Sequence, residues 1–542
     1  MLVWIKKYWA EVLVFAAIAT TLFVTVNPAF TWMNTDSDGV HYTFAAKYMV
    51  LAHNTSAPLF LLLGRLFLFI PFGHEAWRFG LLLAISTIVA SVVIYKIVRY
   101  HLKNNSKQRF YALIASLIYG GSALVISQST IVDTYAFDTM LGLFAYYFAI
   151  QKKWILSSVF VGLLWASHTL FAWMVWIPLL IQFKPMRDRV LVFIALLGFL
   201  FYLYVPIVVV FNHAPNMWNN ATFKGFFTGT SGVLAMLTGQ IAMYDIPKRI
   251  LDTIGILGVS LGLGGVVLVW ALVKTKVEQS LRWLVLIPVV YFVTNISSET
   301  YVYLMPTIAF GVVVVGIALS KIKMGWSYTT AIVAIALLLF NANYFDIGRT
   351  EDPNMSAMKF YNIELAKIPD GQIFLGGRWN WAMVYMYNKE NNRHIIPVST
   401  DSLPSNDYLN ELEAQGIKLV RSQSTNQVDK QYENALSIAT MNEGVWLVKD
   451  TDPSTYGAEV VPAKGNEVLL TQWIGRPVIP EWRWKPSNPW KFIDGSLEVS
   501  EWLFVLQSNR NALFLIGFGA IGWILNSWIW RRSSKKKVVE TA

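Results

Sequence analysis

The chain has no cysteine and little charge. Charged residues make up 14% of its 542 residues. The lack of cysteine excludes disulfide bonds, thiolate metal sites and a cysteine nucleophile. Hydrophobic residues reach 55%, and they are concentrated in runs close to the roughly 20 residues that a helix needs to cross a bilayer. The sequence therefore predicts a polytopic membrane protein.

The first apolar run also lacks the features of a removable leader. It extends from Glu11 to Phe30 behind Lys6 and Lys7 and contains no small-residue cleavage site, so we expect a retained first helix. The net charge is +11, but the basic residues lie in short loops between apolar runs, where they orient helices. We therefore expect no nucleic-acid partner. The range 344–508 is acidic, in contrast to the basic remainder of the chain.

The apolar runs predict about 12 membrane spans. The range 154–183 is too long for one span and is bounded by basic residues on both sides, so we expect two short helices that turn near Ser167 and His168. The other predicted spans are 11–30, 77–98, 110–127, 134–151, 188–211, 250–274, 281–296, 301–320, 325–343 and 511–530.

The basic clusters then lie on one side, which places both termini in the cytoplasm. Three parts follow: a membrane domain over 1–343 with a large first outer loop at 31–76, an outer mixed α/β domain over 344–508, and a final transmembrane helix with a basic tail over 509–542. Within the outer loops, Ala57–Gly73 and Phe226–Gly239 read as interfacial segments. We see no internal repeat of the kind that builds many transporters.

This topology gathers acids, histidines and arginines on the outer side, near the membrane surface. A carboxylate there could act as general base towards an acceptor hydroxyl, while Arg or His could stabilise a departing phosphate. Such a set suits transfer from a lipid-phosphate donor. The simpler interpretation is that outer loops are polar because they are wet. The residues concerned are Asp36, Asp38, His41, His53, Arg65, Arg78, Asp133, His168 and Arg378.

The first outer loop resembles a known family. The stretch Asp36–Ala84, "DSDGVHYTFAAKYMVLAHNTSAPLFLLLGRLFLFIPFGHEAWRFGLLLA", is similar to the first-loop signature of a polytopic family in the GT-C glycosyltransferase superfamily. That family includes the endoplasmic-reticulum protein O-mannosyltransferase of the transmembrane-260 type. The match places Asp38 on the family's aspartate and Arg65 and Arg78 on its two arginines. Asn54–Ala57 and His41 depart from the family pattern.

Further segments match in the same order along the chain. "STIVDTYAFDTML" places Asp133 on the family's acid and Tyr135 on its tyrosine, and "GLLWASHTLFAWMVWIP" carries His168. The resemblance implies that Asp38, or Asp36 if the alignment shifts, is the catalytic base. The resemblance supports donor-phosphate contacts from Arg65, Arg78 and His168, and acceptor or sugar contacts from Asp133 and Tyr135. From their predicted place on the outer side we add His53 to the phosphate contacts and His41 and Arg378 to the acceptor or sugar contacts.

Each of these residues also has a structural interpretation. Asp38 could cap a turn, Arg65 could snorkel to lipid headgroups, Arg78 could pair with Asp133, and a histidine in a loop or core is more often structural than catalytic. "GGRWNW", Gly376–Trp381, is either an exposed binding loop or a buried aromatic turn.

The combined prediction is a GT-C-like, all-α polytopic membrane domain with an extracytoplasmic α/β domain and a final anchor. We expect an inverting transferase that moves a mannose-like hexose from a polyprenyl-phosphate sugar to a protein or glycan hydroxyl outside the cytoplasm. No cofactor is required, although Asp36, Asp38 and His41 could furnish ligands for a divalent metal. The expected location is a prokaryotic plasma membrane, in contact with its lipids. The alternatives are a non-catalytic assembly factor and a lipid or glycan transporter.

Overall fold

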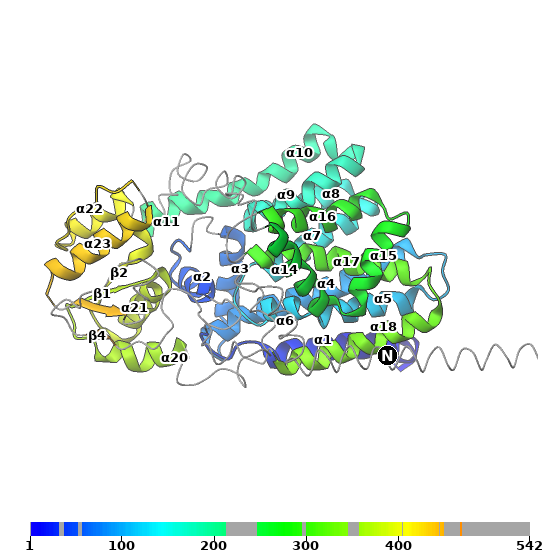
Figure 1. Ribbon diagram of the computed structural model, residues 1–542, viewed down its shortest axis with the longest axis horizontal. Helices are drawn as coiled ribbons and strands as arrows, with labels where there is room; N and C mark the ends of the chain where they lie inside the picture. Colours follow the sequence, from blue (N-terminus) through cyan, green and yellow to red (C-terminus); the bar gives the residue numbers. More distant parts are fainter. Residues whose placement is uncertain are drawn as a thin grey trace, which may run out of the picture.

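The computed structural model consists of a bundle of apolar helices with a small helix-covered sheet at one end (Figure 1). It describes residues 2–31, 37–52, 57–212, 246–294, 300–344, 357–403, 405–425, 427–443, 445–448 and 467–468. We call the end of the bundle next to the sheet the sheet end and the opposite one the far end. The predicted span 511–530, the segment Phe226–Gly239 and most of 449–508 lie outside the described residues.

Five helical segments in the described part of the chain are long and apolar enough to cross a membrane. They are provided by α1 (Leu2–Thr25), α4 (Glu75–His101), the series α10 (Arg189–Leu196), η3 (Leu197–Leu203) and α11 (Tyr204–Asn212), η5 (Thr300–Leu304) with α17 (Met305–Leu319), and α18 (Met324–Tyr344). Their positions match predicted spans. The count of about 12 stays a prediction.

Two further pairs of apolar helices are strongly bent. α5 (Gln108–Gly120) meets α6 (Ala123–Ser129) at 60°, and α14 (Ile246–Leu261) meets α15 (Leu263–Lys274) at 117°. The second bend is at Gly262, whose φ of +52° is a conformation that glycine adopts readily. The range 250–274, predicted as one span, therefore forms two helices that meet at a sharp bend.

Shorter apolar helices fill the rest of the bundle. They are α3 (Pro58–Leu68), α7 (Tyr135–Ile150), α8 (Trp154–Ser167), α9 (Thr169–Gln182) and α16 (Gln279–Thr294). The break predicted near Ser167 and His168 falls at His168, which has an extended backbone between α8 and α9. A single-turn 3-10 helix, η2 (Lys184–Arg187), follows α9.

The sheet has four parallel strands in the order β2-β1-β3-β4. Residue Ile373 of β1 pairs with Ile396 of β2 and with Val445 of β3. The strands are β1 (Ile373–Gly376), β2 (Ile396–Ser399), β3 (Val445–Val448) and β4 (Glu467–Val468), and the helical elements around them are α20 (Ala357–Lys359), η7 (Phe360–Glu364), η8 (Leu365–Lys367), α21 (Arg378–Asn391), η9 (Thr400–Ser402), α22 (Asn406–Ala414) and α23 (Gln427–Met441). The boundaries predicted for the outer domain stay a prediction.

Helix α2 (Ser37–Tyr48) connects the sheet with the bundle, because it packs against both α21 and α3 (Figure 1). The ring of Phe44 on α2 meets Trp381 of α21 edge-on, with centroids 5.5 Å apart. Trp381 is 4% exposed. Within "GGRWNW", this tryptophan therefore belongs to a buried aromatic contact.

A backbone contact between α8 and η3 depends on two glycines. A Cβ added to Gly198 would lie 1.9 Å from the carbonyl oxygen of Gly162. Such a distance is far inside van der Waals contact, so any larger residue must push the two elements apart. Close approach of this kind is typical of small residues at helix interfaces in membranes.

We expect Gly198→Ala to lower the free energy of unfolding by about 1 to 3 kcal/mol, the usual range for overpacking. Thermal unfolding of the purified protein in detergent measures the change. Gly258→Ala is the matched control, because nothing lies within 4 Å of a Cβ added there. Equal unfolding temperatures for the two variants would show that the α8–η3 contact is not close.

Candidate functional site

Asp38 lies in the first turn of α2, where a carboxylate is stabilised by the partial positive charge of the helix N-terminus. The residue is partly exposed. Helix α2 holds it at the sheet end of the bundle. The neighbouring candidate Asp36 lies outside the described residues, so the structure does not separate the two acids.

Tyr42 follows Asp38 by one helical turn and is 3% exposed. Burial raises the pKa of its phenol well above the usual range, and the charges of Asp133, Asp38 and Asp138 raise it further. Tyr42 therefore stays protonated. Its hydroxyl is a neutral group set among three carboxyl groups from α2, the α6–α7 connection and α7.

Asp133 lies in the short connection between α6 and α7 and is 6% exposed. Its Oδ1 accepts a hydrogen bond of 2.6 Å from the backbone N–H of Thr134. The charges of Asp133 and Asp38 both raise the pKa of Tyr42. The structure therefore places these two predicted site residues around one buried phenol.

An aromatic cluster adjoins these acids. The ring of Tyr135 lies 5.8 Å from that of His168 and 5.6 Å from that of Tyr303. His168 is 8% exposed, and its Nδ1 accepts a hydrogen bond from the N–H of Phe171 at the start of α9. Tyr303 also raises the pKa of Tyr42. Tyr135 and His168, which contact Tyr303, therefore belong to the same neighbourhood as Asp38 and Asp133.

The two arginines predicted to bind phosphate donate hydrogen bonds to backbone carbonyl groups. Nη1 of Arg65 donates to the carbonyl oxygens of Ala46 at 2.9 Å and Lys47 at 2.6 Å, which caps the C-terminal end of α2. Arg78 donates to the carbonyls of Gly73 and Leu68, each at 2.9 Å. These bonds fix the first loop. The donor-phosphate role of both residues stays a prediction.

The other predicted contacts are placed only in part. His41 is fully buried, and its ring stacks with that of Phe44 at 6.3 Å. Arg378 begins α21 at the carboxyl end of β1, the position where open parallel sheets commonly bind ligands. His53 lies outside the described residues. The roles of all three stay predictions.

A charged cluster fixes α2 against the sheet. Nζ of Lys47 forms an ion pair of 2.7 Å with Glu75 at the start of α4 and a second one with Glu390 of α21. Glu390 also accepts a hydrogen bond of 2.5 Å from the hydroxyl of Tyr361. Burial alone would lower the pKa of Lys47, but its bonds to Glu390 and Glu75 raise it. The ammonium therefore stays charged and joins three helices.

Sequence reasoning did not single out Tyr42, Tyr303 or Asp138 as site residues. Tyr42 carries a usable signal, because residues i and i+4 share one helix face and Asp38 precedes it by four. Asp138 is an acid inside a predicted span, which by itself indicates function. Tyr303 carries no signal of this kind, since its position depends on packing between distant segments.

The described part of the chain contains no group of residues that could bind a metal ion. No three His, Asp or Glu side chains there lie close enough together to hold an ion. Asp36, one of the ligands named for a divalent metal, is outside that part. The chemistry of the described groups is that of a partly exposed carboxylate beside a neutral phenol, which suits deprotonation of a hydroxyl.

His74 caps α4 next to this region, and its burial has a consequence for pH. Its Nδ1 accepts a hydrogen bond of 3.2 Å from the N–H of Ala76, so the cap requires a deprotonated Nδ1. Burial lowers the pKa of His74 from 6.5 to about 4. The unfolded chain therefore binds a proton between these values that the folded chain does not.

We expect the free energy of unfolding to fall between pH 6.5 and 4, with a His74 contribution on the order of 2 kcal/mol. His74→Asn keeps a capping acceptor and does not titrate, so its stability should fall less over the same window. Thermal unfolding at several pH values measures the difference. Parallel pH profiles for the two proteins would contradict the buried, neutral imidazole.

No protein-family model and no curated protein sequence matches the chain. Among solved structures, the chain is similar to ArnT from Cupriavidus metallidurans in the apo state. The TM-score is 0.50 and the identity is 11%, and the match covers 77% of this chain and 97% of that one. A second structure, the same ArnT bound to undecaprenyl phosphate, matches with a TM-score of 0.47 and 12% identity over 77% of this chain and 96% of that one. The similarity to apo ArnT shows the fold: the chain has an ArnT-like helical architecture. Together with its long apolar helices, this fold makes it an integral membrane protein.

Proposed function

We propose that the protein is a GT-C-type glycosyltransferase that uses a polyprenyl-phosphate sugar and transfers a mannose-like hexose to a hydroxyl of a protein or glycan. The observation that carries the proposal is the position of Asp38. This carboxylate lies at the sheet end of a GT-C-type bundle, partly exposed and next to the buried Tyr42 and Asp133. A reactive hydroxyl could approach it from the solvent side.

A lipid-linked donor fits this position. Nucleotide sugars are confined to the cytoplasm, and we place the sheet end outside it, with both termini inside and the range 344–508 as the outer domain. The end of α3, where Arg65 bonds the C-terminal end of α2, exposes large apolar side chains: Leu66 is 61% exposed, and Phe69, which follows the helix, is 72% exposed. Such a surface suits contact with acyl or prenyl chains. A prokaryotic plasma membrane remains our proposed location.

The proposed mechanism is a single displacement. The Asp38 carboxylate takes the proton of the acceptor hydroxyl as its oxygen attacks the anomeric carbon, the bond from that carbon to the lipid-phosphate oxygen breaks, and the anomeric configuration inverts. The lipid phosphate leaves with the bonding electrons. We assign stabilisation of this anion to Arg65, Arg78, His168 and His53, and contacts with sugar or acceptor to His41, Asp133, Tyr135 and Arg378.

We expect Asp38→Asn to reduce transfer by about 10²- to 10⁴-fold, the usual effect of losing a general base. The measurement is mass spectrometry of surface glycoproteins and envelope glycans from a strain that lacks the protein and is complemented with each variant. Wild type should restore one defined hexose and Asp38→Asn should not.

Asp407→Asn is the matched control, because Asp407 is an exposed acid in the first turn of α22. It should restore the hexose fully. Full restoration by Asp38→Asn would remove Asp38 from the mechanism. A deletion strain with unchanged glycans would favour the assembly-factor or transporter alternative.

We also expect Tyr42→Phe to slow hexose transfer about tenfold, since it removes the hydroxyl set between Asp38 and Asp133 but keeps the ring that packs edge-on against Phe60. The rate is measured in isolated membranes supplied with a polyprenyl-phosphate hexose. Tyr119→Phe removes another fully buried hydroxyl, from the last turn of α5, and should leave the rate unchanged. Equal rates for wild type and Tyr42→Phe would show that the phenol does not contribute.

A further inference from the structure

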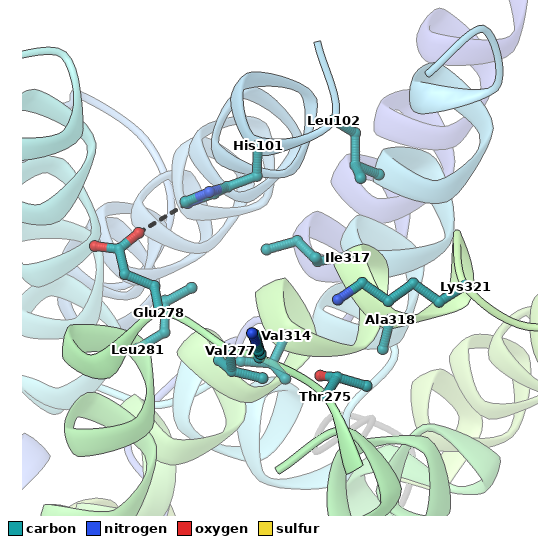
Figure 2. A pocket seen from close by; sticks show the side chains of 11 residues that line it. His101, Leu102, Thr275, Val277, Glu278, Leu281, Val314, Ile317, Ala318 and Lys321 are labelled. Carbon is teal, nitrogen blue, oxygen red and sulfur yellow. Dashed lines mark ion pairs between the residues drawn. The ribbon is translucent and has the colours of Figure 1, made fainter. Parts of the chain in front are cut away.

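A cavity of about 390 Å³ lies at the far end of the bundle, where α4 ends (Figure 2). It is bounded by the end of α4, the connection between α15 and α16, and the end of α17. Its size is at the lower end of the range for small-molecule sites. A second cavity, lined by residues 101–106, shares His101 and Leu102 with it.

The length of α4 fixes the depth of this cavity in a membrane. The helix has 27 residues, which span roughly 40 Å at 1.5 Å per residue. The hydrocarbon core of a bilayer is about 30 Å thick. Since Glu75 begins α4 at the sheet end and His101 ends it, the cavity lies at the level of the lipid headgroups of the opposite leaflet.

Two cationic side chains line the cavity. Lys276 and Lys321 both line it and are exposed. Figure 2 shows the side chain of Lys321 extending into the cavity. In the part of the chain that the structure describes, neither ammonium group has an ionic or hydrogen-bonding partner. Two ammonium groups at headgroup depth attract phosphate.

The side opposite Lys321 carries a carboxylate (Figure 2). Glu278 accepts hydrogen bonds from Ser280 at 2.7 Å and from Tyr146 at 3.3 Å, and its Oε2 lies 3.9 Å from Nε2 of His101. These contacts hold Glu278 in place across the cavity from Lys321. The walls between them are apolar and include Leu281, Val314 and Ile317.

We propose that this cavity binds the headgroup of a membrane phospholipid. The lysines bind the phosphate, Glu278 accepts from a donor beyond the phosphate, such as an ammonium or a hydroxyl, and the apolar walls contact the lipid next to the phosphate. The cavity is thus selective for headgroups that carry a donor. This site is separate from the one around Asp38 and does not depend on the function proposed for that site.

The test uses the purified full chain in detergent and short-chain lipids measured by native mass spectrometry. The probes are phosphatidylethanolamine and phosphatidylglycerol, which carry a headgroup donor, phosphatidylcholine, which lacks one, and inorganic phosphate. We expect the first two to bind more tightly than the others. Lys321→Gln should weaken lipid binding about fivefold, the effect of losing one exposed ion pair, and Lys276→Gln provides an independent second variant.

Glu278→Gln should bring ethanolamine and glycerol headgroups to the affinity of choline, and thermal unfolding of each variant checks that it is folded. The control is Lys323→Gln, which removes an exposed lysine two residues from Lys321 that does not line the cavity. Equal weakening by Lys323→Gln would reduce the effect to general surface charge and overturn the proposal. Inorganic phosphate bound as tightly as lipid, or lipid binding that neither cavity lysine affects, would overturn it as well.

Discussion

The ion pairs of Lys47 are the interaction on which the arrangement of the sheet end depends. One ammonium group links the last turn of α2 to the first turn of α4 and to the last turn of α21. Partly buried charges lose little of their attraction to solvent screening, so this link fixes the helix that carries Asp38 with respect to both the bundle and the sheet. Arg65 stabilises the same end of α2, because it donates hydrogen bonds to the carbonyl oxygens of Ala46 and Lys47.

A second constraint is the polarity of the residues between the membrane and the sheet. Asp133, Asp138 and Tyr42 are all buried at this end. Removing carboxyl groups from water is costly unless they gain polar neighbours or a proton. The phenol of Tyr42 and the backbone N–H of Thr134 provide such neighbours. Among the described acids of this grouping, Asp38 is the partly exposed one, as the role of general base proposed for it requires.

The sequence predicted the helical class and much of the segmentation, because apolar run length and the placement of basic residues act locally. The break at His168 is an example: basic residues at both ends of 154–183 require an even number of crossings. The bend at Gly262 was not predicted, since "LGLGG" is as apolar as the helices around it. The capping by Arg65 was missed as well, because its partners lie 18 and 19 residues earlier in the chain.

For the site, the sequence identified Asp38, Asp133, Tyr135 and His168 as candidates, and the structure brings them into one neighbourhood. Tyr303 joins them through rings that meet across α7, α9 and η5. No local pattern encodes such a meeting. Long-range packing decides it, and single-sequence reasoning has no access to that packing.

The unbroken length of α4 also restricts the bilayer thickness in which the protein is stable. At one end Glu75 pairs with Lys47, and the other end borders the far-end cavity, so both ends must stay in the polar layers of the bilayer. A membrane thicker than the apolar part of α4 would draw charged groups into hydrocarbon, and the helix has no break that could absorb the difference. Hydrophobic mismatch of this kind costs fractions of a kcal/mol per Å. The fixed length of α4 therefore favours bilayers of ordinary thickness over thicker ones.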